Sequence, residues 1–206
     1  MAITYPLSLP QVRRNGAIIT FSSLKMTAVS NVALSSSIWT YKQFVQTHSG
    51  EMWRLSATLP VLTEEEASPW IAWIISLKGQ YGTFMCGDPS RATPIGSALG
   101  SPVVASAVNK GNSTITTSGW TANQPKVLCA GDYIQIGTHL HMILEDAASG
   151  SAGTAVLSIF PSLRENVSAN TQIIVNEPKG IFRLGNDSVE YSVSTAHHYS
   201  ISISAL

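Results

Sequence analysis

One helical pattern stands out in a sequence whose other segments are spaced like β-strands. In the stretch "TEEEASPWIAWIISLKGQ" the large apolar residues recur at positions i, i+3, i+4 and i+7, which is one face of a helix. These residues are Trp70, Trp73, Ile74 and Leu77. A lone helix with such a face needs a sheet to cover it. We therefore predict that the tryptophan face is core, packed on a sheet, and not a platform for a ligand.

The sequence offers two start signals for this helix. Thr63 and Glu66 have the spacing of an N-terminal capping box, whereas Pro69 suits the first position of a helix. Because proline lacks an N–H and is poorly tolerated deep inside a helix, we predict a strong helix over 69–78. Residues 64–67 are expected to form a looser lead-in.

Alternating apolar and polar residues predict β-strands before the helix. In "GEMWRLSATLP" four apolar side chains share one face, namely Trp53, Leu55, Ala57 and Leu59. Together with the preceding "IWTYKQFVQTHSG", this segment predicts a hairpin that turns at Ser49-Gly50. The spacing of apolar residues from Ala17 to Leu34 predicts two further short strands.

The composition changes near residue 91, where a stretch rich in small and polar residues begins. Strand patterns return at 133–136, 140–144 and 155–160, and a last strand alternates isoleucine with serine near the C-terminus. We predict a mainly β fold with two domains. Residues 1–95 together with 178–206 would form a discontinuous β-sandwich flanked by one α-helix, and 96–177 an inserted small β-barrel-like domain.

Charge and hydropathy narrow the classes of function. Twelve Lys and Arg balance twelve Asp and Glu, and only 12% of the 206 residues are charged. This gives no electrostatic signal for binding nucleic acid or anionic lipid, and a net charge near zero favours self-association. The N-terminus has no secretory pattern, and the longest apolar run is far shorter than the roughly 20 residues of a membrane span. We expect synthesis in the cytoplasm, with Cys86 and Cys129 as buried thiols.

Few residues are arranged for chemistry. His139 and His141 share a strand face and are the best metal candidates, but no third ligand is marked by spacing, so we read them as a solvated face. His197 and His198 are adjacent and would point to opposite faces of a strand. Cys86 and Asp88 in "CGDPS" lack a recognisable histidine partner and read as a strand end and a turn. We predict a protein that is not an enzyme, without catalytic, cofactor-binding or metal-binding residues and without a cofactor.

Five segments resemble, in this order, a family of phage proteins: "ITYPLSLP", "GEMWRLSATLP", "WIAWIISLKGQYGTFMCGDP", "AGDYIQIG" and "PKGIFRL". The family is the distal tail proteins of long-tailed, siphovirus-type bacteriophages. The resemblance implies a tail-tube-like β-sandwich with one flanking helix. It also implies a homo-oligomeric ring, usually a hexamer, in the virion at the phage tail tip, assembled in the host cytoplasm.

The resemblance implies partners as well. The ring would connect the tail tube protein to the tail-tip or hub protein, with receptor-binding or fibre proteins as further candidates. DNA would only pass through the channel, no membrane would be bound, and the family has no catalytic residues to carry over.

This chain departs from the better-studied members, which append a galectin-like domain after the ring domain. Three alternatives therefore stay open. The chain could be another minor tail or tail-tip adaptor protein. The inserted domain could bind host glycan, although its aromatic candidates, Trp120 and Tyr133, read as core. A cell-wall hydrolase is disfavoured because no nucleophile or metal motif is present.

Overall fold

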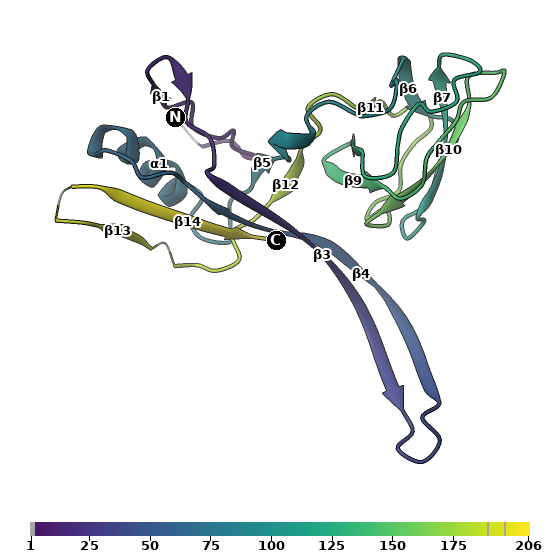
Figure 1. The fold of residues 1–206 in the computed structure, drawn as a ribbon, viewed down its shortest axis with the longest axis horizontal. Helices are drawn as coiled ribbons and strands as arrows, with labels where there is room; N and C mark the ends of the chain where they lie inside the picture. Colours follow the sequence, from purple (N-terminus) through teal and green to yellow (C-terminus); the bar gives the residue numbers. More distant parts are fainter. Residues whose placement is uncertain (1–2, 189, 196) are drawn as a thin grey trace. The chain divides into compact units, whose positions relative to one another are not determined.

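The computed structural model describes residues 3–188, 190–195 and 197–206, and the chain is mainly β with one α-helix in this part (Figure 1). It divides into two compact units. The first contains the residues up to Thr27, Arg54–Asp88 and Lys179–Leu206. The second contains Ala28–Trp53 and Pro89–Pro178, and includes a barrel-like sheet. The domain boundaries predicted from the sequence, at 95 and 178, state which parts of the chain fold independently. They remain predictions.

The first unit is built on antiparallel strands from both ends of the chain. A four-stranded sheet has the order β13-β14-β4-β3, with bounds Tyr191–Val193, Tyr199–Ala205, Gln43–Thr58 and Ser23–Ser36. The outer parts of β3 and β4, within Ala28–Trp53, are grouped with the second unit. Two smaller pairs are β5–β12, Phe84–Cys86 with Gly180–Phe182, and β1–β2, Arg13–Arg14 with Ala17–Ile18. A bridge between Leu184 and Ala205 continues the β12 segment beside β14. The C-terminal strands are therefore paired with strands from the first half of the chain.

The predicted alternation of β4 and β14 is confirmed. The apolar face of β4 is buried through Trp53, Leu55, Ala57 and Leu59. In β14, Ile201 and Ile203 are buried while the intervening serines are exposed. One face of this sheet therefore carries the core and the other carries hydroxyl groups.

The helix α1 spans Glu64–Ser76 and begins five residues before the predicted start. The Glu66 carboxylate accepts a hydrogen bond from the Thr63 N–H at 2.9 Å and from the Arg14 guanidinium at 2.7 and 2.5 Å. The bond from Arg14, followed by that from the Thr63 backbone, lowers the pKa of Glu66 to about 2. Pro69 lies inside the helix with its ring exposed. The prediction of a start at Pro69 was wrong because the contacts of Glu66 stabilise the first turn, and proline costs one helical hydrogen bond there.

The tryptophan face of α1 is buried, as predicted. Trp70 is 1% exposed, Trp73 is 8% exposed, and Leu77 is inaccessible. The two indole rings contact each other with centroids 5.9 Å apart, and the Trp73 ring lies 5.2 Å from that of Phe84. Trp73 Nε1 also donates a hydrogen bond to the Ser8 carbonyl at 2.8 Å. These aromatic contacts form the core between the helix and the strands.

The predicted hairpin at Ser49-Gly50 is wrong. β4 runs without a break from Gln43 to Thr58, and the turn that joins it to β3 lies between Ser37 and Lys42, whose backbone groups bond at 3.0 Å. The segment from Ala17 to Leu34 contains the short β2 and the long β3, not two short strands. A Ser-Gly pair is a frequent turn signal, but strand-forming residues on both sides keep the chain extended there.

The second unit contains a six-stranded antiparallel sheet that forms a nearly closed, barrel-like shape. Its order is β11-β8-β9-β10-β7-β6, with bounds Ile173–Ile174, Tyr133–Ile136, His139–Ile143, Ala155–Phe160, Thr114–Trp120 and Gly100–Val104. Val104 donates to the Thr171 carbonyl at 2.9 Å and accepts from the Asn170 N–H at 2.8 Å, so the two edges meet. A short 3-10 helix, Pro89–Arg91, precedes the sheet. The three strands predicted between 133 and 160 are confirmed to within a residue or two.

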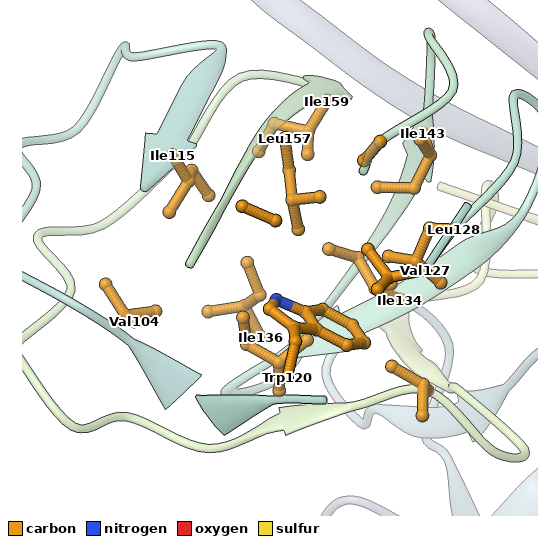
Figure 2. Packing of buried hydrophobic residues seen from close by; sticks show 14 of the residues in the cluster. Val104, Ile115, Trp120, Val127, Leu128, Ile134, Ile136, Ile143, Leu157 and Ile159 are labelled. Carbon is orange, nitrogen blue, oxygen red and sulfur yellow. The ribbon is translucent and has the colours of Figure 1, made fainter. Parts of the chain in front are cut away.

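The interior of this barrel is apolar. Figure 2 shows the Trp120 indole packed among aliphatic side chains that include Val127, Ile134 and Ile136. Trp120 Nε1 donates to Thr117 Oγ1 at 2.8 Å, so its polar atom is also satisfied inside the core. The unit therefore has a hydrophobic core of its own.

Asp132 holds the loops at one end of the barrel. Its carboxylate is 1% exposed and accepts backbone N–H bonds from Ile95, Gly96 and Cys129 at 2.8, 3.1 and 2.8 Å. Asp132→Ala leaves these three partly buried donors without their acceptor, so we expect a loss of about 2–4 kcal/mol in unfolding free energy. Chemical denaturation would measure this. Asp146→Ala, which removes an exposed carboxylate bonded to Ala130, is the control, and an equal loss in both variants would contradict the assignment.

Candidate interaction surface: the β3–β4 arm

The outer part of the β3–β4 ribbon is an exposed arm, defined here as residues 30–48 (Figure 1). Apart from the half-buried Ser37, every residue of the arm is exposed, so both faces of the ribbon are open to solvent. β3 is also the last strand of its sheet, and its outer edge carries unpaired backbone groups. The arm contributes no side chains to a core.

The arm is unusually apolar for an exposed segment. Its tip carries Trp39, Ile38 and Tyr41, which are 93%, 84% and 83% exposed. The strands add exposed apolar residues on both sides of the turn: Val32, Leu34, Phe44 and Val45. Lys42 is the only charged residue between 30 and 48. Contiguous apolar surface of this kind marks an interaction site.

A ribbon of this type is not expected to be stable alone. Two strands without a covered face are at best marginally stable in water, and exposed strand edges readily pair with other chains. The lack of charge also removes the usual protection against association. The arm therefore has the physical properties of a segment that is covered by a protein partner.

The base of the arm is anchored within the second unit. The Trp53 ring contacts Tyr133 and Phe160 with centroid distances of 5.8 and 5.2 Å. The Glu51 carboxylate accepts the Ser162 N–H at 2.8 Å, and Arg164 donates to the Glu51 carbonyl at 3.2 Å. These contacts fix one end of the ribbon and leave its tip free.

The interpretation of His139 and His141 as a solvated face was wrong. The two residues do share a face, but His141 is 1% exposed and His139 is half-buried. His141 lies directly opposite Ile134 in the strand pairing, so both side chains lie on the core face of the barrel. Leu140 on the other face is also buried. Both faces of β9 are covered. The alternation of residues along the strand could therefore not show that neither face is solvated.

His141 is held as a neutral imidazole. Its Nδ1 lies 2.7 Å from the Pro161 carbonyl oxygen. Burial lowers its pKa to about 4, with smaller effects from the Pro161 bond, which opposes the shift, and from His139 and Arg164. His139 Nε2 lies 3.7 Å from a Glu165 oxygen. Within the described ranges, no group of three or more His, Cys, Asp or Glu side chains could hold a metal ion.

The other candidate residues are not gathered into a site. Cys86 and Cys129 are free thiols, the first buried and the second half-buried. Burial raises the pKa of Cys86 to about 11, which makes it a poor nucleophile at neutral pH. His197 and His198 are exposed in the segment before β14, and not on a strand as assumed.

The aromatic glycan candidates are part of the core. Trp120 is 4% exposed and Tyr133 is 6% exposed. Neither offers a ring face to a sugar, which agrees with the expectation that both are core residues. The exposed aromatic residues of the second unit lie instead on the arm, at Trp39, Tyr41 and Phe44. Sequence reasoning missed them because their segment was assigned to an ordinary hairpin strand.

Comparison with known proteins gives no family for this chain: no family model matches it, and no curated protein matches its sequence. In the described part of the chain, no helix has the length and apolar character needed to cross a bilayer.

Proposed function

We propose that this chain is a structural subunit that assembles with copies of itself into a ring at the distal end of a long-tailed phage tail. The ring would join the tail tube to the tail-tip or host-recognition apparatus and surround the DNA channel. In this proposal the first unit is a tail-tube-like β-sandwich and forms the ring together with the arm. The barrel-like sheet is a module inserted in it.

The arm is the observation that carries the proposal. In a heterologous contact, the arm of one copy covers a different surface of the next copy. Such contacts generate a closed ring when the rotation from each copy to the next adds up to a full turn. The sheet β13-β14-β4-β3 also ends in two open strands, β13 and β3, so backbone pairing between copies is available at both ends. An arm with a single charged residue and without a core of its own has little use in a monomer.

Two further features support the proposal. The segments that resemble distal tail proteins include the C-terminal part of β4, the second half of α1 and the strand β12. These elements belong mainly to the first unit, and a further resembling segment contains β8 of the second unit. The neutral, charge-poor composition also suits a subunit that is covered by neighbours better than a protein that stays dispersed.

Assembly through the arm can be tested with a double substitution. We expect the wild-type protein to sediment as a ring, with six-fold averages in electron micrographs. The variant Trp39→Ser/Phe44→Ser should sediment as a monomer with an unchanged circular dichroism spectrum, because both residues are exposed and support no core.

Leu144→Ser/Val156→Ser is the matched control. Leu144 directly follows β9 and is 51% exposed, and Val156 lies in β10 and is 59% exposed. Replacing these two apolar residues should leave assembly intact. A wild-type protein that stays monomeric at tens of micromolar, or an arm variant that still forms rings, would overturn the role of the arm.

A further inference from the structure

The segment 161–165 connects the barrel to the base of the arm. Its Ser162 N–H and Arg164 guanidinium bind Glu51 of β4, as described above. On the barrel side, Pro161 contacts His141, and Leu163 exchanges backbone hydrogen bonds with Gly111 and Asn112 at 2.6 and 2.9 Å. The segment is thus held between a buried histidine and the arm.

The geometry around His141 defines its protonation. The Pro161 carbonyl can only accept, so Nδ1 must carry the hydrogen and Nε2 must carry the lone pair. Nε2 is buried and has no hydrogen-bond partner among the residues that the structure describes. A proton added there would create a buried charge with no acceptor, which is strongly unfavourable.

The neighbouring charges do not compensate such a proton. His139 on the same strand and Arg164 in the segment both disfavour a positive charge on His141. Glu165, whose side chain is 76% exposed, lies against His139. Ile134, opposite His141 on β8, is apolar. Relief of the charge therefore requires that the imidazole reach water, and the group that contacts the ring is the carbonyl of Pro161, the first residue of the segment.

The segment borders an open groove of about 520 Å³. Ser162, Leu163 and Arg164 line this groove together with Glu51 and Lys110. Displacement of the segment from β9 and from Glu51 would bring water to His141 and break the two contacts with Glu51.

We propose that His141 is an acid-sensitive latch: protonation opens the segment 161–165 and releases the base of the arm. This inference concerns the second unit alone and does not depend on ring assembly. The closed state is fully favoured above the ordinary histidine pKa of about 6.5, and it loses stability as the pH falls toward 4. Over that range the ratio of closed to open molecules should fall on the order of 100-fold.

Hydrogen–deuterium exchange of the full chain tests the latch. We compare peptides that cover 161–165 and 50–54 at pH 7.5 and pH 4.5, after correction for the intrinsic exchange rate. In the wild type both peptides should lose protection at the lower pH, while peptides from β7 and β10 stay protected. His141→Asn, whose amide can still donate to the Pro161 carbonyl but does not titrate, should keep protection at both pH values.

His198→Asn, which removes an exposed histidine of the first unit, is the control and should behave like the wild type. Acid-induced exchange that persists in His141→Asn would overturn the latch, as would protection of the wild-type segment at pH 4.5. A histidine NMR titration of the wild type gives an independent readout if the variant does not fold. A His141 ring that titrates near 6.5 without any change in the segment would also overturn the proposal.

Discussion

Replacing Trp70 by alanine is expected to lower the free energy of unfolding by about 3–5 kcal/mol. The side chain is 1% exposed and contacts Trp73 and Phe21 with ring centroids 5.9 Å away in each case. Its removal leaves a large cavity between α1 and the strands, which the close-packed neighbours cannot fill. Thermal and urea denaturation followed by circular dichroism would measure the loss.

The same helix provides a matched control. Ile75 is 59% exposed, so Ile75→Ala should change the stability by less than about 0.5 kcal/mol. Near wild-type stability of Trp70→Ala would show that the tryptophan face does not form the core. A folded Trp70→Ala protein that has only lost a ligand would also contradict this assignment.

Local periodicity predicted the parts of the fold that bury one face. The stripe of α1 and the alternation of β4 and β14 each depend on the residues within one element. Burial of such a face follows from the hydrophobic effect once any sheet is present. For this reason the helix face, the mainly β class and the strands between 133 and 160 were predictable from the sequence.

Features that depend on distant residues were not predictable. The helix start depends on Arg14, which reaches Glu66 from 52 positions away. The burial of His141 depends on the barrel closing around β9, and its polar partner is the carbonyl of Pro161. The exposure of the arm could not be read from its sequence either, because residues such as Trp39 and Phe44 are the types that usually form a core.

The two ends of the chain share the first unit, and this has a consequence for deletions. β5 ends at Cys86, which lies directly opposite Gly180, the first residue of β12. The chain therefore leaves the first unit next to the place where it returns. Loop-closure entropy grows only slowly with length, so the intervening segment should contribute little to the folding of the first unit.

Replacing 89–178 by a short Gly/Ser bridge is therefore expected to leave a soluble β-protein that unfolds cooperatively. The bridge has only to join two neighbouring strands. Trp53 loses its contacts with Tyr133 and Phe160, so a moderate decrease in melting temperature is expected. Circular dichroism measures the folding, and light scattering shows whether the shortened chain still self-associates.

Ending the chain at Pro178 should instead abolish cooperative unfolding, although this deletion removes far fewer residues. It deletes β14, which lies between β13 and β4 in the sheet, and β12, the partner of β5. The buried side chains lost with them are Phe182, Leu184, Ile201, Ile203 and Ala205. The apolar face of α1 and β4 would then be open to water, and β4 would become a long unpaired edge. A truncated chain that melts cooperatively and still assembles would show that the C-terminal strands are not needed for the first unit. The residues before 89 would then have to fold as a separate linear domain.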